Sequence, residues 1–127
     1  MTRRNLSKES ALLAVEAALE KKALEPCLLD VSADASYTDF ILIVSARSDR
    51  QVQAIADHIV DAFAALRQRP IGKEGMKDWV LIDFGDLIVH VFYHPVREFY
   101  DLEGLWIEAP RVPLQVPAEA RVMEPMY

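Results

Sequence analysis

The sequence has only one cysteine, Cys27, which excludes an internal disulfide bond and a zinc site made of several cysteines. Its four glycines stand at positions 72, 75, 85 and 104, and no spacing among them makes the GxGxxG or GxxxxGKS loop that cradles a phosphate. No uncharged apolar run reaches the length of about 18 residues that spans a membrane. Lys8 and Glu9 interrupt the region where a signal peptide would be apolar. We therefore expect a cytoplasmic protein with no membrane partner.

The charge of the chain is unevenly distributed. Its 127 residues are 52% apolar and 27% charged, as is typical of one folded domain, and the net charge is −6. Residues 83–108 contain one basic residue, Arg97, and six acidic ones: Asp83, Asp86, Glu98, Asp101, Glu103 and Glu108. Negative charge repels a phosphate backbone and attracts a basic protein, so this stretch favours a basic protein partner over direct, sequence-specific nucleic-acid binding. The alternative is that the acidic stretch only keeps the protein soluble.

The first 44 residues predict one helix followed by two strands. Ser7 is a suitable N-cap for a helix that reaches about Lys22, and Pro26 then ends it. The inward face of this helix consists of Leu12, Val15 and Leu19. Residues 27–31 and 40–44 are aliphatic runs of strand length. The unbroken apolar run at 40–44 indicates a strand buried on both faces.

A second helix is predicted in the middle of the chain. Ser48 and Gln51 have the spacing of a capping box at its N-terminus. Its apolar stripe consists of Val52, Ile55, Ala56, Ile59, Phe63 and Leu66. Pro70 and Gly72 end the helix, and residues 70–77 are expected to form a mobile loop.

The last third of the chain predicts a β-hairpin, a short helix and an extended tail. Strands at 79–84 and 87–93 flank Gly85-Asp86, a dipeptide typical of tight hairpin turns. Pro95 fits the first turn of one helix that continues to about Trp106. The inward face of that helix would be formed by Phe99, Leu102 and Trp106. Four prolines within residues 109–127 indicate a tail that is extended and loosely held.

This order of elements predicts an α+β fold with a mixed sheet of four to five strands flanked by helices. Strands as apolar as residues 40–44 need cover on both faces, so the helices should lie on both sides of the sheet. The middle helix would then form the crossover between parallel strands. We assign residues 1–110 to one domain and residues 111–127 to a proline-rich, extended C-terminal tail.

No complete catalytic or metal-binding constellation emerges from the sequence. His90 and His94 are four residues apart, but they fall in a strand and at its end, so His90 is better placed for a structural or interface role. Asp83 and Asp86 flank a turn, where carboxylates commonly bind local backbone amides. Ser45 precedes a helix start, where anions can bind, but it lacks a Gly-x-Ser-x-Gly elbow. We expect no cofactor and no metal.

Aromatic and aliphatic side chains are concentrated beside the acidic stretch. They are Trp79, Tyr93, Phe99, Tyr100, Leu102, Leu105 and Trp106. In the hairpin, Trp79, Leu81 and Asp83 share one face, and an aspartate on that face indicates that the face is only partly buried. Tryptophan and tyrosine surrounded by acidic residues are typical of a protein-binding surface.

Several segments together form a recognisable pattern. DWVLIDFGDLIVHVF at residues 78–92 is followed by REFYDLEGLW at 97–106, and upstream DFILIVS at 39–45 precedes SDRQV at 48–52. In this combination and order, the chain resembles the ribosomal silencing factor (Iojap) family over about residues 7–110.

The sequence departs from the family pattern at three places. The family often has Gly-Thr where this chain has Ala46-Arg47, and a basic residue where it has Gly104. The segment from Gly75 to Trp79 is also short. None of the three departures lies in the predicted hairpin strands.

The resemblance implies a fold related to the nucleotidyltransferases but without their catalytic residues. It implies binding to the large ribosomal subunit through ribosomal protein fourteen. Occupying that face would block joining of the small subunit and repress translation when nutrients are scarce, with no reaction performed. The residues that we expect to contact the partner are Trp79, Leu81, Tyr100, Leu102 and Trp106 for apolar contact, and Asp83, His90, Asp101 and Glu103 for polar and charged contact.

The sequence leaves two other functions open. One is a nucleotidyltransferase-like enzyme that uses Mg²⁺, although Ser45 lacks the preceding glycine, and Asp83 and Asp86 are spaced Asp-x-x-Asp across a turn. The other is a dimeric scaffold unrelated to the ribosome, in which the apolar surface is a self-interface. A homodimer of the free protein is also compatible with the silencing function.

Overall fold

A computed structural model describes residues 3–122 of the chain, with side chains from Lys8 onward. Its mixed five-stranded sheet has the order β1-β2-β5-β4-β3. The strands are β1 (Leu24–Asp30), β2 (Phe40–Ala46), β3 (Gly72–Met76), β4 (Trp79–Asp83) and β5 (Leu87–Tyr93). The helices are α1 (Arg3–Glu20), α2 (Asp49–Ala64), α3 (His94–Tyr100) and α4 (Leu102–Leu105), with a 3₁₀ turn, η1 (Ala118–Ala120). The predicted α+β fold with a mixed sheet is confirmed, whereas the relation to nucleotidyltransferases stays a prediction.

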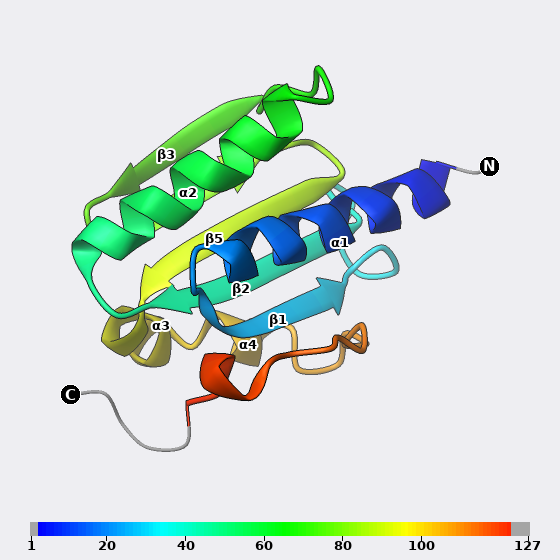
Figure 1. Cartoon of the computed structure of the whole chain (residues 1–127). Coiled ribbons are helices and arrows are strands. Elements are labelled where there is room, and N and C mark those ends of the chain that lie inside the picture. The colour runs from blue at the N-terminus through cyan, green and yellow to red at the C-terminus, as the bar shows by residue number, and fades with distance from the viewer. Residues whose placement is uncertain (1–2, 123–127) are drawn as a thin grey trace.

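Helices cover both faces of the sheet, as expected. Helices α1 and α2 lie side by side across one face (Figure 1). They bury the side chains of β2 that point toward them. The segment α3–α4 packs against the opposite face of β1, β2 and the end of β5, through Val96, Leu102 and Trp106. Strand β2 lies parallel to β5 and antiparallel to β1, and all seven of its residues are buried, as its unbroken apolar sequence predicts.

Helix α2 and the β4–β5 hairpin agree with the sequence prediction. The Ser48 hydroxyl accepts a hydrogen bond of 3.1 Å from the Gln51 amide, which confirms the N-cap. The predicted apolar stripe of α2 is buried as far as Phe63, but Leu66 lies beyond the end of the helix and is 55% exposed. Strands β4 and β5 pair antiparallel across the predicted turn, where Gly85 adopts a φ of 90°.

Helix α1 packs mainly through alanines; of the predicted inward face, Val15 is buried and Leu19 packs against the core, but Leu12 does not face inward. Its buried side chains are Ala11, Ala14, Val15, Ala17 and Ala18, whereas Leu12 is 40% exposed. Small side chains allow a close approach between the helix and the sheet. The helix begins at Arg3, so Ser7 is not its N-cap, and it ends at Glu20, before Lys22 takes a left-handed φ of 65°.

The C-terminal tail runs along β1 and is not loosely held. The Asp30 amide donates a hydrogen bond of 2.9 Å to the Pro110 carbonyl, and the Val112 amide donates one of 2.8 Å to the Leu28 carbonyl. Farther along, Ala120 is 4% exposed. The expectation of a loosely held tail is therefore wrong for residues 110–122, since they cover part of a strand edge that would otherwise be unpaired. Residues 123–127 lie outside the described chain.

Pro26 belongs to β1 and does not end the first helix. The ladder between β1 and β2 shifts register between Leu24 and Cys27, which marks a bulge. Glu25 takes a φ of 47° within this bulge. Proline has no N–H to donate to a neighbouring strand. It is tolerated in an outer strand at a bulge because that donor is not needed there.

Two further predictions for the second half of the chain are wrong. Residues 72–76 form β3, which pairs with β4, instead of a mobile loop. The single helix expected over 95–106 is divided at Asp101, which has a φ of 45° and a ψ of 53°. Phe99, before the division, is 80% exposed, and only Leu102 and Trp106 of the predicted inward face pack against the sheet.

Candidate protein-binding surface

The sheet face opposite α1 and α2 is only partly covered over β3, β4 and the first half of β5. In register across these strands, Glu74 lies beside Leu81, which lies beside His90. Met76 and Glu74 are exposed, while Trp79, Leu81, Asp83 and Ile88 are half-buried. We call this surface the sheet patch; it consists of Glu74, Met76, Trp79, Leu81, Asp83, Ile88, His90 and Tyr100.

Trp79 is the centre of the sheet patch. Its ring stacks on Phe92 with the centroids 4.8 Å apart, and it contacts Tyr100 from α3 at 4.9 Å. Its indole Nε1 donates a hydrogen bond of 3.1 Å to Nδ1 of His90. Phe92 is fully buried, whereas Tyr100 is 54% exposed. The Trp79 ring therefore lies between the core and the exposed surface and contacts both.

The sheet patch carries negative charge, and its one histidine, His90, adds no positive charge to offset it. Burial lowers the pKa of His90 from the ordinary 6.5 to about 4, so the imidazole is neutral at pH 7. The only basic residue of 83–108, Arg97, is itself buried and paired with Glu103. The exposed surface of this stretch therefore displays no lysine or arginine charge.

The structure divides the predicted contact residues into two groups. Trp79, Leu81, Asp83, His90 and Tyr100 meet in the sheet patch, and the exposed Asp101 follows Tyr100 directly, between α3 and α4. The second group lies below the surface: Leu102 and Trp106 are half-buried against the second core cluster, and Glu103 is held in an ion pair.

Three members of the sheet patch were missed by the sequence prediction. Ile88 alternates with His90 along β5, so the two-residue period of a strand could have identified it. Glu74 and Met76 belong to β3, an outer strand whose mostly exposed residues give no apolar alternation. Only its pairing with β4 brings these side chains to the patch.

A buried polar network built on Arg97 anchors α3–α4 to the sheet. Its Nε and Nη2 donate to the two carboxylate oxygens of Glu103 at 2.9 and 3.0 Å. Its Nη1 donates to the Glu25 carbonyl at 2.7 Å and to the Ser45 hydroxyl at 3.0 Å. Burial alone would raise the pKa of the Glu103 carboxyl, but the hydrogen bonds and charge of Arg97 hold that pKa below its ordinary value.

Ser45, His94 and Glu98 form a serine–histidine–acid chain within this network. His94 Nδ1 lies 2.8 Å from the Ser45 hydroxyl, and its Nε2 lies 2.8 Å from a Glu98 oxygen. The sequence alone did not place a histidine beside Ser45. Ser45 is 0% exposed and its oxygen also accepts from Arg97, so the hydroxyl is out of reach of a substrate and serves to hold β2 against α3.

Asp83, before the hairpin turn, bonds locally in the fold. An Asp83 oxygen accepts a hydrogen bond of 2.8 Å from the Gly85 amide, the arrangement of an Asx turn. Within residues 3–122, no group of three or more His, Cys, Asp and Glu residues is placed to hold a metal ion. Over the same residues, no helix is long and apolar enough to cross a membrane.

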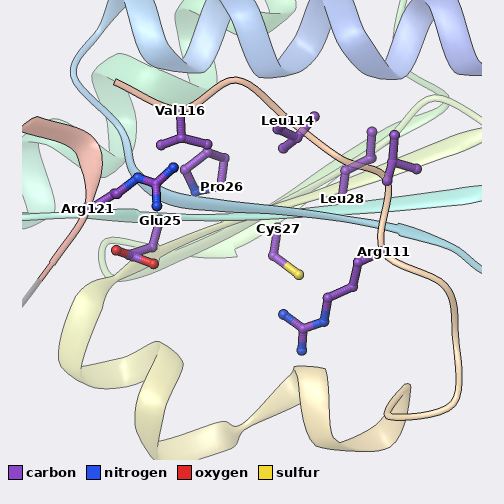
Figure 2. A pocket seen from close by; sticks show the side chains of 9 residues that line it. Glu25, Pro26, Cys27, Leu28, Arg111, Leu114, Val116 and Arg121 are labelled. Atoms are coloured by element: carbon purple, nitrogen blue, oxygen red, sulfur yellow. The ribbon is translucent and has the colours of Figure 1, made fainter. Parts of the chain in front are cut away.

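A pocket of about 230 Å³ lies between β1 and the C-terminal tail (Figure 2). Pro26, Leu28, Leu114 and Val116 are among its apolar lining residues, and Arg111 and Arg121 are among its charged ones. Cys27 also borders the pocket, and burial raises the pKa of its thiol, with a further contribution from Glu103. The cysteine therefore behaves as a neutral, buried side chain.

Comparison with known proteins identifies the family. The profile of the family described as "Ribosomal silencing factor during starvation" matches residues 4–125. The chain belongs to the ribosomal silencing factor family. Its relative "Ribosomal silencing factor RsfS" from Halalkalibacterium halodurans is 41% identical over 112 residues, which cover 86% of this chain and 95% of the relative.

Members of the family from other sources share the fold and parts of the sequence. A crystal structure of a protein from Chromobacterium violaceum superposes with a TM-score of 0.77 at 33% identity, covering 87% of this chain and 93% of that one. A mouse relative is named "Mitochondrial assembly of ribosomal large subunit protein 1"; it is 30% identical over 92 residues, which cover 68% of this chain and 40% of the relative.

Proposed function

We propose that the protein binds the large ribosomal subunit through ribosomal protein fourteen and sterically blocks joining of the small subunit. It would thereby repress translation in the cytoplasm without performing a reaction. Membership of the ribosomal silencing factor family supports the ribosomal role. The choice of site rests on the sheet patch, where aromatic rings packed around Trp79 are bordered by the exposed Glu74 and Asp101. Residues 83–108 expose no cation there, and Lys77 is exposed in the turn between β3 and β4.

The composition of the sheet patch suits a basic protein surface. Tyr100 and Met76 offer exposed apolar area, and large aromatic anchors contribute much of the binding energy at protein interfaces. Glu74 and Asp101 provide exposed negative charge at the border. Ribosomal proteins are rich in lysine and arginine, so complementary charge would steer the encounter and fix the orientation.

The rigid backing of the sheet patch suits a steric blocker. The patch lies on paired strands whose other face is covered by α1 and α2, and α3–α4 is fixed by the Arg97 network. A blocker has to hold its shape against the approaching subunit, and a surface built on a packed sheet changes little on binding. In the free protein, we expect the same apolar area to favour pairing with a second copy.

The proposal is tested with variants that leave the core intact. Tyr100→Ala removes an exposed patch ring, and Tyr37→Ala removes an equally exposed ring in the loop between β1 and β2. We expect Tyr100→Ala to weaken binding to purified ribosomal protein fourteen about thirtyfold, as for loss of an interface anchor worth about 2 kcal/mol, and Tyr37→Ala to leave it unchanged.

A charge variant and an assembly experiment complete the test. Met76→Arg places a positive charge on the exposed edge of the patch, and Leu66→Arg places one on an exposed leucine beyond the end of α2. We expect only Met76→Arg to prevent the protein from migrating with large subunits in a sucrose gradient and to restore whole ribosomes. Wild-type behaviour of both Tyr100→Ala and Met76→Arg would contradict the proposed site.

A further inference from the structure

A second charged surface, opposite in sign to the sheet patch, lies where α1 ends and α2 begins. It consists of four exposed cations, Lys21, Lys22, Arg47 and Arg50. We call it the basic corner. The Gln51 side chain ties its two segments together: Oε1 accepts from the Arg47 amide at 2.6 Å, and Nε2 donates to the carbonyls of Lys21 and Lys22 at 3.2 and 3.0 Å. The cations therefore extend from backbone held in a fixed arrangement.

The four side chains of the basic corner are not held in ion pairs within the described chain. Among residues 3–122, no ion pair involves its four side chains, whereas Lys73 is paired with Asp57 and Arg97 with Glu103. Of the neighbouring carboxylates, Glu20 is engaged by His58 at 2.9 Å. Asp49 lies in the first turn of α2 beside Arg50, and Glu119 lines a pocket of about 300 Å³ together with Lys22 and Arg47, so the four cations outnumber the three carboxylates near them.

The basic corner lies at the same end of the sheet as the aromatic end of the sheet patch. In the parallel pair of β2 and β5, Ala46 is opposite Tyr93. Arg47 follows Ala46 directly, and α3, which carries Tyr100, begins directly after Tyr93. The basic corner and Tyr100 therefore lie at one end of the sheet, toward its two different faces. A macromolecular surface broad enough to reach the corner from Tyr100 has to be acidic there to be complementary.

We propose that the basic corner binds the phosphodiester backbone of ribosomal RNA while the sheet patch binds a ribosomal protein. The inference rests on the proposed function, because a ribosomal protein on the subunit surface is surrounded by RNA. Lysine and arginine bind phosphates through charge and hydrogen bonds, and such contacts position a protein without reading sequence. The two surfaces, one acidic and one basic, would together fix the orientation of the protein on the subunit.

The test compares two double variants that change the net charge equally. Arg47→Gln/Arg50→Gln neutralises half of the basic corner, and Arg67→Gln/Arg69→Gln neutralises two exposed arginines just after the other end of α2. The affinity of each variant for purified large subunits is measured over a range of salt concentrations. Loss of two phosphate contacts should reduce the slope of log affinity against log salt by about 1.8, whereas the control pair should keep the wild-type slope.

Binding to isolated ribosomal protein fourteen separates this inference from the proposed function. Both double variants should bind that protein as the wild type does. Lys21→Gln/Lys22→Gln, on the other segment of the corner, should reduce the salt slope for subunits by a similar amount. Wild-type slopes for both corner variants, or an equal reduction in the Arg67/Arg69 control, would overturn the RNA contact. If the corner variants reduce the salt slope for subunits but the wild-type protein does not bind isolated ribosomal protein fourteen, the RNA contact is supported and the proposed protein partner is refuted.

Discussion

The indole Nε1 of Trp79 donates a hydrogen bond of 3.1 Å to Nδ1 of His90 on the adjacent strand. The acceptor nitrogen has to be unprotonated, so the neutral imidazole carries its proton on Nε2. Burial acts in the same direction, because it lowers the pKa of His90 to about 4. The hydrogen bond orients the tryptophan at the centre of the sheet patch and keeps the patch free of histidine charge at neutral pH.

The pKa of His90 predicts that the protein loses stability in mild acid. The unfolded chain binds a proton at His90 as the pH falls below about 6.5, while the folded protein binds it only near pH 4. The free energy of unfolding should therefore be about 2 kcal/mol lower at pH 5 than at pH 7 on account of this group. Urea unfolding at both pH values should show that His90→Gln removes this difference and that His58→Gln, which changes a less buried histidine, retains it.

Replacing Arg97 should be far more costly than breaking an exposed ion pair. Arg97→Ala leaves the Glu103 carboxylate unpaired and the Glu25 carbonyl without its donor, so we expect a loss of about 3 kcal/mol or more. Arg97→Lys should recover only part of it, since an ammonium group does not donate to both Glu103 oxygens in parallel. Lys73→Ala, which breaks the exposed pair with Asp57, should cost less than about 1 kcal/mol in the same urea titrations. Equal losses for Arg97→Ala and Lys73→Ala would contradict this account.

The two glycines of β3 should respond differently to alanine. A Cβ at Gly75, where φ is 150°, would lie 2.3 Å from the Trp79 carbonyl oxygen and 2.7 Å from Val80 Cα, so the backbone has to move. A Cβ at Gly72 would meet nothing within 4 Å. We expect Gly75→Ala to cost about 2 kcal/mol and to expose the β3 amides to hydrogen exchange. Gly72→Ala should keep both the stability and the protection, and identical behaviour of the two variants would refute the explanation.

A charge at the buried end of the tail should release it from β1. Ala120 is buried in η1, whereas Ala118, two residues earlier, is exposed. Ala120→Asp should therefore cost up to about 2 kcal/mol, and Ala118→Asp should be nearly neutral. Hydrogen exchange of the Val112 amide, which donates to the Leu28 carbonyl, reports whether detachment spreads along the tail. Unchanged protection of Val112 in Ala120→Asp would show that η1 is not needed to hold residues 110–112.

The sequence predicted those elements whose signal lies within a few neighbouring residues. The unbroken apolar run of β2, the stripe of α2 and the turn at Gly85 each contain their own signal within a few residues. The same local signals placed Trp79, Leu81 and Asp83 on one face of the hairpin. These features need no distant partner to be recognised, because side-chain alternation and turn geometry are set by neighbouring residues.

Other features depend on residues that are distant in the sequence. Strand β3 has almost no apolar pattern, and it exists because β4 offers an unpaired edge. The α3–α4 segment breaks at Asp101, while Arg97 is held by Glu103 after the break and by the Glu25 carbonyl 72 residues away. The expected contact role of Glu103 was assigned without this ion pair, since nothing in the local sequence shows which charges meet.

The amino-acid sequence by itself determined the family, the central hairpin and the acidic character of residues 83–108, because these lie in contiguous segments. Tertiary structure alone decided which aromatic rings face outward, that His90 is neutral, and that four cations from two distant segments of the chain lie near Gln51. Exposure, pKa and charge clustering all depend on which distant groups pack together, and that packing is a property of the whole fold.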